Sequence, residues 1–295
     1  MGKKGGCAAV YLVGALALLP GGAQAQWRSQ FEAAFVHDSN LSRAQLAPDK
    51  VRDMALIAGA RLARIYAVGD DADLSVGADA RLTRYNKSHG ASFASLGAIA
   101  GWRHKLGLGL TAPWVALDGS AALEDAREDI RDGMRYVLSA AAGKRFMREL
   151  EASAGVAYDR RVQREGYEEE EPGYGGKPFS IQGRSLFARA NYALGERATL
   201  IGAAALREGD VVSSTRRNFA IFGASNAIAD DPAFGPDFIA YRLSGARTRT
   251  LTGGLSWQLG PRSTLDATLT RDDTRVGGGL DYDAVIFALT FVVRR

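Results

Sequence analysis

Three histidines are the side chains best suited to acid–base chemistry: His37, His89 and His104. A hydrolytic site built on a histidine also needs a hydroxyl nucleophile and an orienting carboxyl or amide group close to it. His37 is followed by Asp38 and Ser39, which makes it the nearest candidate for such a site. Consecutive residues of a strand point to opposite faces, so these three side chains cannot form a triad among themselves. The sequence therefore predicts no catalytic residue and no enzymatic activity.

Charged side chains that recur at every second position form a larger set. They alternate with glycine, serine and threonine along segments whose other face is apolar, so they share one face of each segment. Two hypotheses follow. Side chains of opposite charge pair and fill a narrow lumen, or an arginine-rich wall of a water-filled passage favours anionic solutes. The predicted lumen-lining residues are Arg61, Asp79, Arg81, Arg103, Asp118, Arg135, Glu151, Asp159, Arg189, Arg207 and Asp266.

An acidic run, YEEEEPGYGG at residues 167–176, could collect divalent cations close to lipopolysaccharide. Its four consecutive glutamates repel one another, and no Asp or Asn with calcium-ligand spacing accompanies them. A solvated loop is the favoured interpretation. We therefore expect no metal site and no cofactor.

The stretch DLSVGADARLTRYN, residues 73–86, indicates which element carries the charged residues. Leu74, Val76 and Ala78 alternate with Ser75, Gly77 and Asp79, and a period of two is typical of a β-strand. The chain predicts an all-β fold, a closed antiparallel transmembrane β-barrel of about 12 strands, within a range of about 10–14. The segments are 27–37, 54–67, 73–86, 94–105, 113–124, 133–145, 150–161, 184–194, 198–208, 247–259, 263–273 and 282–293.

Short and long connections alternate between these segments. Residues 69–72, 145–149 and 195–198 are short, whereas 162–183 and 209–246 are long. Short periplasmic turns and long extracellular loops are typical of outer-membrane barrels, while a soluble β-sandwich or lipocalin-like barrel has no reason to separate them. Connection 209–246 is long enough to fold inward as a plug or constriction, and the alternative is that its phenylalanines pack on the neighbouring loops.

Tyrosine and tryptophan recur near the ends of the apolar faces. Such rings prefer membrane interfaces, because the ring favours lipid and its N–H or O–H favours water. This placement predicts that the apolar face meets lipid rather than a protein core. The predicted membrane-interface aromatics are Tyr66, Trp102, Tyr136, Tyr158, Tyr192 and Trp257.

The N-terminus has the pattern of a secretory signal peptide. Lys3 and Lys4 precede an apolar run that ends in Ala23-Gln24-Ala25, which predicts a signal peptide at 1–25 and a barrel domain at 26–295. The only cysteine, Cys7, leaves with the signal. Removing the two lysines lowers the formal net charge from +4 to +2, and this balance argues against a nucleic-acid partner.

The closing stretch LDYDAVIFALTFVVRR, residues 280–295, together with the signal and the alternation, resembles Gram-negative outer-membrane β-barrel proteins. FVHDSNLSRA, residues 35–44, is similar to the first strand and loop of the barrel domains in surface lipoprotein assembly modifiers. The resemblance implies location in the cell outer membrane, contact with outer-membrane lipid and lipopolysaccharide, and handling by the barrel assembly machinery during biogenesis. It does not predict an oligomeric state.

Two functions remain open at this point. The first is a porin-like passive channel for small hydrophilic solutes, with a preference for anions. The alternative is a non-conducting structural, assembly or surface-binding barrel that acts through its extracellular loops, and a lipid-modifying enzyme is the third and least favoured. Fold alone does not choose among them.

Overall fold

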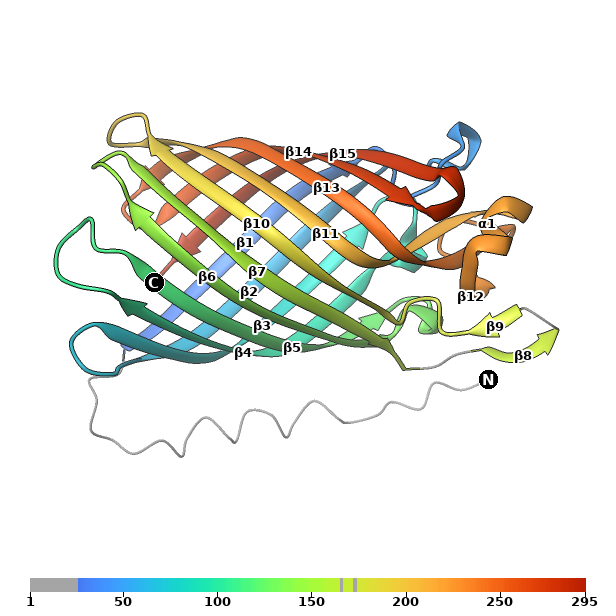
Figure 1. Cartoon of the computed structure of the whole chain (residues 1–295), viewed down its shortest axis with the longest axis horizontal. Helices are drawn as coiled ribbons and strands as arrows, with labels where there is room; N and C mark the ends of the chain where they lie inside the picture. Colours follow the sequence, from blue (N-terminus) through green and yellow to red (C-terminus); the bar gives the residue numbers. More distant parts are fainter. Residues whose placement is uncertain (1–25, 165–166, 172–173) are drawn as a thin grey trace.

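The computed structural model describes residues 26–295 except 165–166 and 172–173, so the predicted signal peptide lies outside it. Within the described residues, twelve antiparallel strands form a barrel (Figure 1). They are β1 (Gln26–Asp38), β2 (Asp53–Ala67), β3 (Ala72–Tyr85), β4 (Phe93–Lys105), β5 (Trp114–Ala126), β6 (Gly133–Arg145), β7 (Leu150–Gln163), β10 (Ile181–Ala193), β11 (Ala198–Arg216), β13 (Phe238–Gly260), β14 (Ser263–Val276) and β15 (Leu280–Arg294).

The barrel closes between its first and last strands. β1 pairs with β2 on one side and with β15 on the other, where Phe35 lies opposite Leu289. Each of the other strands pairs with the barrel strands before and after it, and β11 pairs with β13. Closure satisfies the backbone hydrogen-bonding groups that an open sheet edge would leave exposed. The predicted fold class is confirmed.

Alternation along each strand separates an inward face from an outward face. On β3, Leu82 points outward and is 55% exposed, whereas its neighbour Thr83 points inward and is 3% exposed. A belt of exposed apolar side chains surrounds the barrel, including Leu56, Leu62, Leu138, Leu186, Leu251 and Phe287. A continuous apolar surface of this kind is unfavourable in water and matches the hydrocarbon core of a bilayer.

The two ends of the barrel differ in their connections. Residues 68–71, 146–149, 194–197 and 261–262 make tight turns at one end, which we call the turn end. The C-terminus lies there too, since Ser29 and Arg295 exchange two backbone hydrogen bonds of 2.9 Å. The other end, the loop end, carries β8 (Tyr167–Glu171), β9 (Tyr174–Gly176), α1 (Phe219–Ala224) and β12 (Ser225–Asp230) (Figure 1).

Four single-turn helices also occur in the loop-end connections of the described chain. They are η2 (Ala47–Asp49), η3 (His89–Ala91), η4 (Asp129–Arg131) and η5 (Gly277–Gly279). Because none of the described helices combines sufficient length with sufficient apolarity, no helix is a candidate for crossing a membrane.

Residues 209–246, which were predicted to form one long connection, are mostly strand, so the connection is shorter than predicted. β11 continues to Arg216 and β13 starts at Phe238, and these two residues pair with each other. The first part of β13, FIAYRL, is buried at five of its six positions, because β11 and β12 pair with its two edges and loops cover it. An element covered on both faces shows a continuous apolar run instead of alternation, so the sequence pattern did not reveal it.

Candidate functional site in the barrel lumen

The eleven predicted lumen residues all lie on inward positions of barrel strands. Register places Arg61 opposite Asp79 and Arg81 opposite Gly59, with their side chains on the same face of the sheet. The exposure of these residues differs by charge. Five arginines are exposed to solvent, whereas among the carboxylates only Asp118 is exposed and the other four are half-buried. The exposed arginines are Arg61, Arg81, Arg103, Arg135 and Arg189.

Part of this set forms ion pairs along the lumen wall, between strands that lie near one another. Arg207 donates to both carboxylate oxygens of Asp159 at 3.0 Å, and Gly183 makes room for it, since a Cβ there would lie 2.4 Å from the Arg207 guanidinium carbon. Glu151 accepts from Arg145 at 3.3 Å and lies 3.9 Å from Arg103. Within the described part of the chain, Arg61, Arg135 and Arg189 have no ion-pair partner.

Sequence analysis missed several inward charges. Glu32 pairs with Arg81 at 2.7 Å, and Glu124 pairs with Arg161 at 2.5 Å. Glu124 and Arg161 lie inside predicted strands at inward positions, so counting by two to the strand ends would have found both. Glu32 is harder to find, because Ala34 and Val36 follow it on the same face and weaken the alternation.

The connection between β1 and β2, residues 39–52, packs against the extension of β11. The Ser214 N–H donates to the Ser42 carbonyl at 2.8 Å, and the Ser213 hydroxyl donates to the Arg43 carbonyl at 2.9 Å. The Thr215 hydroxyl donates to the Asp49 carboxylate. Around the barrel, three strands separate β1 from β11, so this connection reaches across part of the mouth.

A buried ion pair joins two further connections at the mouth. Arg131 donates to both carboxylate oxygens of Asp231 at 2.9 and 2.6 Å, and Asp231 is fully buried. The guanidinium also lies over the rings of Phe179 and Phe234, at 4.6 and 5.1 Å from their centroids. The Ser214 hydroxyl donates to the same Asp231 carboxylate, which joins this pair to the β11 extension.

We call these interlocked connections, residues 39–52, 86–92, 127–132 and 217–237, the cap. Residues 86–92 belong to it because a Cβ at Gly90 would lie 2.7 Å from the Ala233 Cα, so only glycine permits this approach. Arg43 adopts a left-handed backbone conformation with φ of 53°. Burial would lower the pKa of its guanidinium, but the charge and hydrogen bond of Asp38 outweigh burial and raise that pKa.

Asp132 shows how tightly the cap packs at the start of β6. Burial raises the pKa of this carboxyl, because the charged form loses solvation. The Ala126 N–H donates to the carboxylate at 2.7 Å and acts in the opposite direction. The cap therefore encloses polar groups that pair with one another.

Among the described residues, cavities lie inside the barrel near both of its ends. One of about 430 Å³ lies under the cap, and its lining includes Arg43, Glu124, Arg135, Arg161 and Arg207. Another of about 570 Å³ lies at the turn end, where the Arg103 guanidinium is 4.1 Å from the centroid of the Trp114 ring. Both cavities are lined by charged side chains, as a path for hydrophilic solutes requires.

The predicted membrane-interface aromatics lie on outward positions of the barrel. Tyr136, Tyr158, Tyr192 and Trp257 are 37–48% exposed. Tyr66 differs, since it is 7% exposed and the Arg64 guanidinium lies 5.1 Å from its ring centroid. Trp102 is half-buried and stacks on His104 with centroids 5.8 Å apart.

The remaining chemical candidates do not form a site. His37 points outward and Asp38 inward, where Asp38 pairs with Arg43 at 2.9 Å. The His89 ring nitrogen contacts the Tyr85 carbonyl at 3.0 Å. In the described residues no cluster of three or more His, Cys, Asp or Glu could hold a metal. The acidic run 167–176 lies partly outside these residues, so the prediction made for it stays untested.

Comparisons with known proteins support the fold. No family model matches the sequence, and no curated protein matches it. An outer-membrane channel from Pseudomonas putida F1 is similar in structure, with a TM-score of 0.53 and 12% identity, covering 96% of this chain and 98% of that one. This chain has the fold of an outer-membrane β-barrel.

Two further solved barrels are less similar. The translocator domain of the autotransporter NalP from Neisseria meningitidis has a TM-score of 0.44 and 10% identity, covering 93% of this chain and 89% of that one. The KdgM porin in complex with oligogalacturonate has a TM-score of 0.42 and 8% identity, covering 90% and 98%. The similarity of residues 35–44 to surface lipoprotein assembly modifiers stays a prediction.

Proposed function

We propose that the protein is a passive outer-membrane channel for small hydrophilic solutes and that its lumen favours anions. The observation that carries this proposal is the unequal exposure of lumen charges. Exposed guanidinium groups project from the wall, while most carboxylates are half-buried against their neighbours. A mobile anion therefore meets more accessible positive than negative charge along the wall.

The cap controls entry from the loop end in this account. Its contacts join connections from separate parts of the mouth, and the 430 Å³ cavity lies beneath them. Solutes therefore enter when the cap loosens or through narrow gaps between its segments. We expect the wild-type barrel to conduct in small steps and a barrel without the cap to conduct in larger ones.

Reversal potentials in planar bilayers under a potassium chloride gradient test the selectivity. We expect wild-type protein to favour chloride. Replacing the three unpaired lumen arginines with serine, R61S/R135S/R189S, should shift the reversal potential toward cation preference. The matched control R84S/R160S removes two outward arginines at the loop end and should leave the potential unchanged. Equal potentials for the lumen variant and the wild type would contradict the anion preference.

The cap also favours a second candidate, a non-conducting barrel that binds a partner through its loop end. Its buried ion pair between Arg131 and Asp231 is the specific observation, since it joins two connections and holds the loop-end surface in one shape. Absence of discrete conductance from folded barrels both with and without the cap would select this candidate. Discrete conductance from the wild-type barrel would exclude it.

A further inference from the structure

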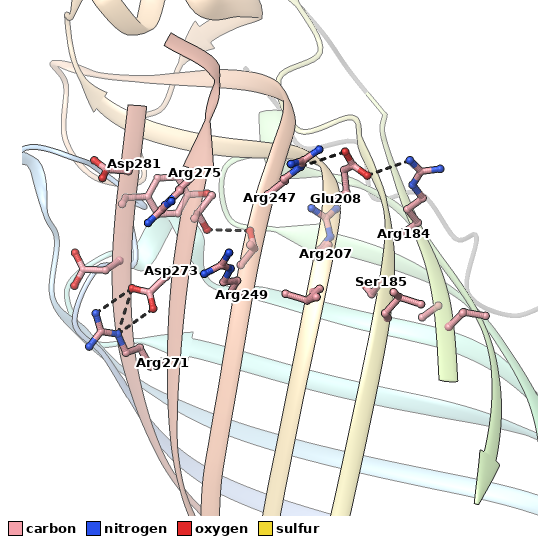
Figure 2. A pocket seen from close by; sticks show the side chains of 18 of the residues that line it. Arg184, Ser185, Arg207, Glu208, Arg247, Arg249, Arg271, Asp273, Arg275 and Asp281 are labelled. Atoms are coloured by element: carbon pink, nitrogen blue, oxygen red, sulfur yellow. Dashed lines mark hydrogen bonds and ion pairs between the residues drawn. The ribbon is translucent and has the colours of Figure 1, made fainter. Parts of the chain in front are cut away.

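Five arginines gather on the outward wall of the barrel at the loop end (Figure 2). They project from β10, β13 and β14, three strands close together on one side of the barrel. Together with Glu208 and Asp273 they border a hollow of about 1150 Å³. We call this group the arginine patch: Arg184, Arg247, Arg249, Arg271 and Arg275.

The patch lies directly at the edge of the apolar belt. On β13 the outward series changes from Leu251 to Arg249 within one outward step, and on β14 it changes from Leu269 to Arg271. Both leucines are more than half exposed, at 62% and 55%. Guanidinium groups directly beyond exposed leucines lie at the level of lipid headgroups in the leaflet at the loop end.

The arginines of the patch only slightly outnumber the carboxylates on the same face: Arg249 lies opposite Asp273 and Arg275 lies opposite Asp281 in the strand register, while Asp283 pairs with Lys50. The patch therefore keeps a small excess of positive charge. Glu208 is shared by Arg184 at 3.0 Å and Arg247 at 3.5 Å (Figure 2). Asp273 pairs with Arg271 at 3.1 Å. In the part of the chain that the structure describes, the other two members of the patch have no ion-pair partner; they are Arg249 and Arg275.

The strand register adds an unfavourable contact within the patch. Arg247 lies directly opposite Arg275, and like charges in this position destabilise a sheet. The side chains of Arg184 and Arg247 are both 79% exposed, so they are free to reorient toward a ligand. An anion between Arg247 and Arg275 would remove their repulsion. Guanidinium binds phosphate oxygens in a planar, two-point geometry.

We propose that the arginine patch binds the phosphate groups of an anionic lipid in the leaflet at the loop end. Its headgroup phosphates contact Arg247, Arg249 and Arg275, and its acyl chains lie along the exposed leucines below, such as Leu206 and Leu251. Free phosphate offers the arginines the same chemistry as the headgroup, but it has no acyl chains to contact the exposed leucines. A lipid with two phosphates matches the patch better than one with a single phosphate, because two members lack ion-pair partners.

Two other outward arginines at the loop end provide an internal control. Arg84 lies opposite Leu56, and Arg160 lies opposite Tyr136. Each lies opposite an apolar or aromatic side chain, and neither has a second guanidinium directly opposite it. Both occupy the outward face, so they match the patch in exposure but not in clustering.

Lipid binding to purified barrel in neutral detergent tests the proposal, with native mass spectrometry as readout and bisphosphorylated lipid A as probe. We expect R247A/R249A/R275A to weaken lipid A binding by about tenfold or more, the loss expected for three arginines at an anionic surface. R84A/R160A should bind like wild type. Binding is read without conductance, so its failure leaves the channel proposal unaffected.

Three outcomes would overturn the inference. The first is equal lipid A binding by the triple variant and wild type. The second is an equal loss in R84A/R160A. The third is displacement of lipid A by millimolar inorganic phosphate, which would identify a site for the free anion. If the triple variant does not migrate as a folded barrel, the single exposed substitution R249Q must weaken binding, and wild-type binding must fall with added salt.

Discussion

The cap and the arginine patch lie at the same end of the barrel and use the same pair of chemical groups, yet they differ in exposure. In the cap, Asp231 is fully buried and Arg131 is 18% exposed. In the patch, Arg184 is 79% exposed and Glu208 is 43% exposed. Buried partners depend on each other because water cannot replace either of them, whereas exposed partners exchange readily with solvent or ligand. The buried pair stabilises the closed cap, whereas the exposed pair leaves its charges available to bind a ligand.

The strand pleat produces both arrangements from neighbouring residues. Arg207 and Glu208 are consecutive on β11, but Arg207 points inward to Asp159 and Glu208 points outward to Arg184. Side-chain alternation alone therefore assigns one residue to the lumen and the next to the lipid boundary.

Breaking the buried pair of the cap should have the largest effect. Asp231→Ala leaves the Arg131 guanidinium buried without its partner, which should destabilise the closed cap by about 3–5 kcal/mol. Amide hydrogen exchange at Ser214, whose N–H donates to Ser42, measures this opening. The double variant R131A/D231A should recover part of the loss, because neither charge is then left alone. A change below about 1 kcal/mol in the free energy of cap opening in the single variant would show that this ion pair does not hold the cap closed.

A charge on the outward face of the barrel below the loop end should have the next largest effect. Ala78 points outward on β3 between Leu62 and Ala98, so Ala78→Arg should lower the free energy of unfolding by about 2–4 kcal/mol. Urea titration in lipid measures it. Arg81→Ala, on the inward face of the same strand, is the control and should cost less. Wild-type stability of Ala78→Arg would reverse the assignment of the two faces.

Removing the exposed pair of the patch should have the smallest effect on stability. Arg184→Ala loses an ion pair in which both side chains contact solvent, so the free energy of unfolding should change by about 0–1 kcal/mol. The same urea titration applies. A loss as large as that of Asp231→Ala would mean that exposure does not distinguish the patch from the cap.

Sequence periodicity was sufficient to predict the strands of the barrel wall. Every predicted segment overlaps a barrel strand, because a sheet with lipid on one side and water on the other imposes a period of two. The same parity placed Arg61 and Asp79 on one face. It did not predict the extensions of β11 and β13. Residues 238–243 of β13 are covered on both sides and show no alternation.

The cap could not be predicted from periodicity. Arg131 and Asp231 are 100 residues apart, and neither belongs to a periodic segment. Their meeting depends on how separate connections fold over one mouth, which no local pattern encodes. The arginine patch was predictable in part, since four of its members lie within predicted strands on the face assigned to lipid and only Arg275 lies beyond one. Their clustering depends on the register between strands, which the sequence pattern does not give.

Conductance of a barrel without its largest cap segment shows whether the lumen is an open path that the cap narrows. Arg216 pairs with Phe238, so residues 217–237 can be replaced by Asn-Gly, a two-residue turn that suits an antiparallel hairpin. Both proteins are first checked for folded-barrel migration and then compared in planar bilayers. We expect discrete steps from both proteins, with larger steps from the shortened barrel. A folded wild-type barrel that gives no discrete steps would mean that the protein is not a channel, whatever the shortened barrel does.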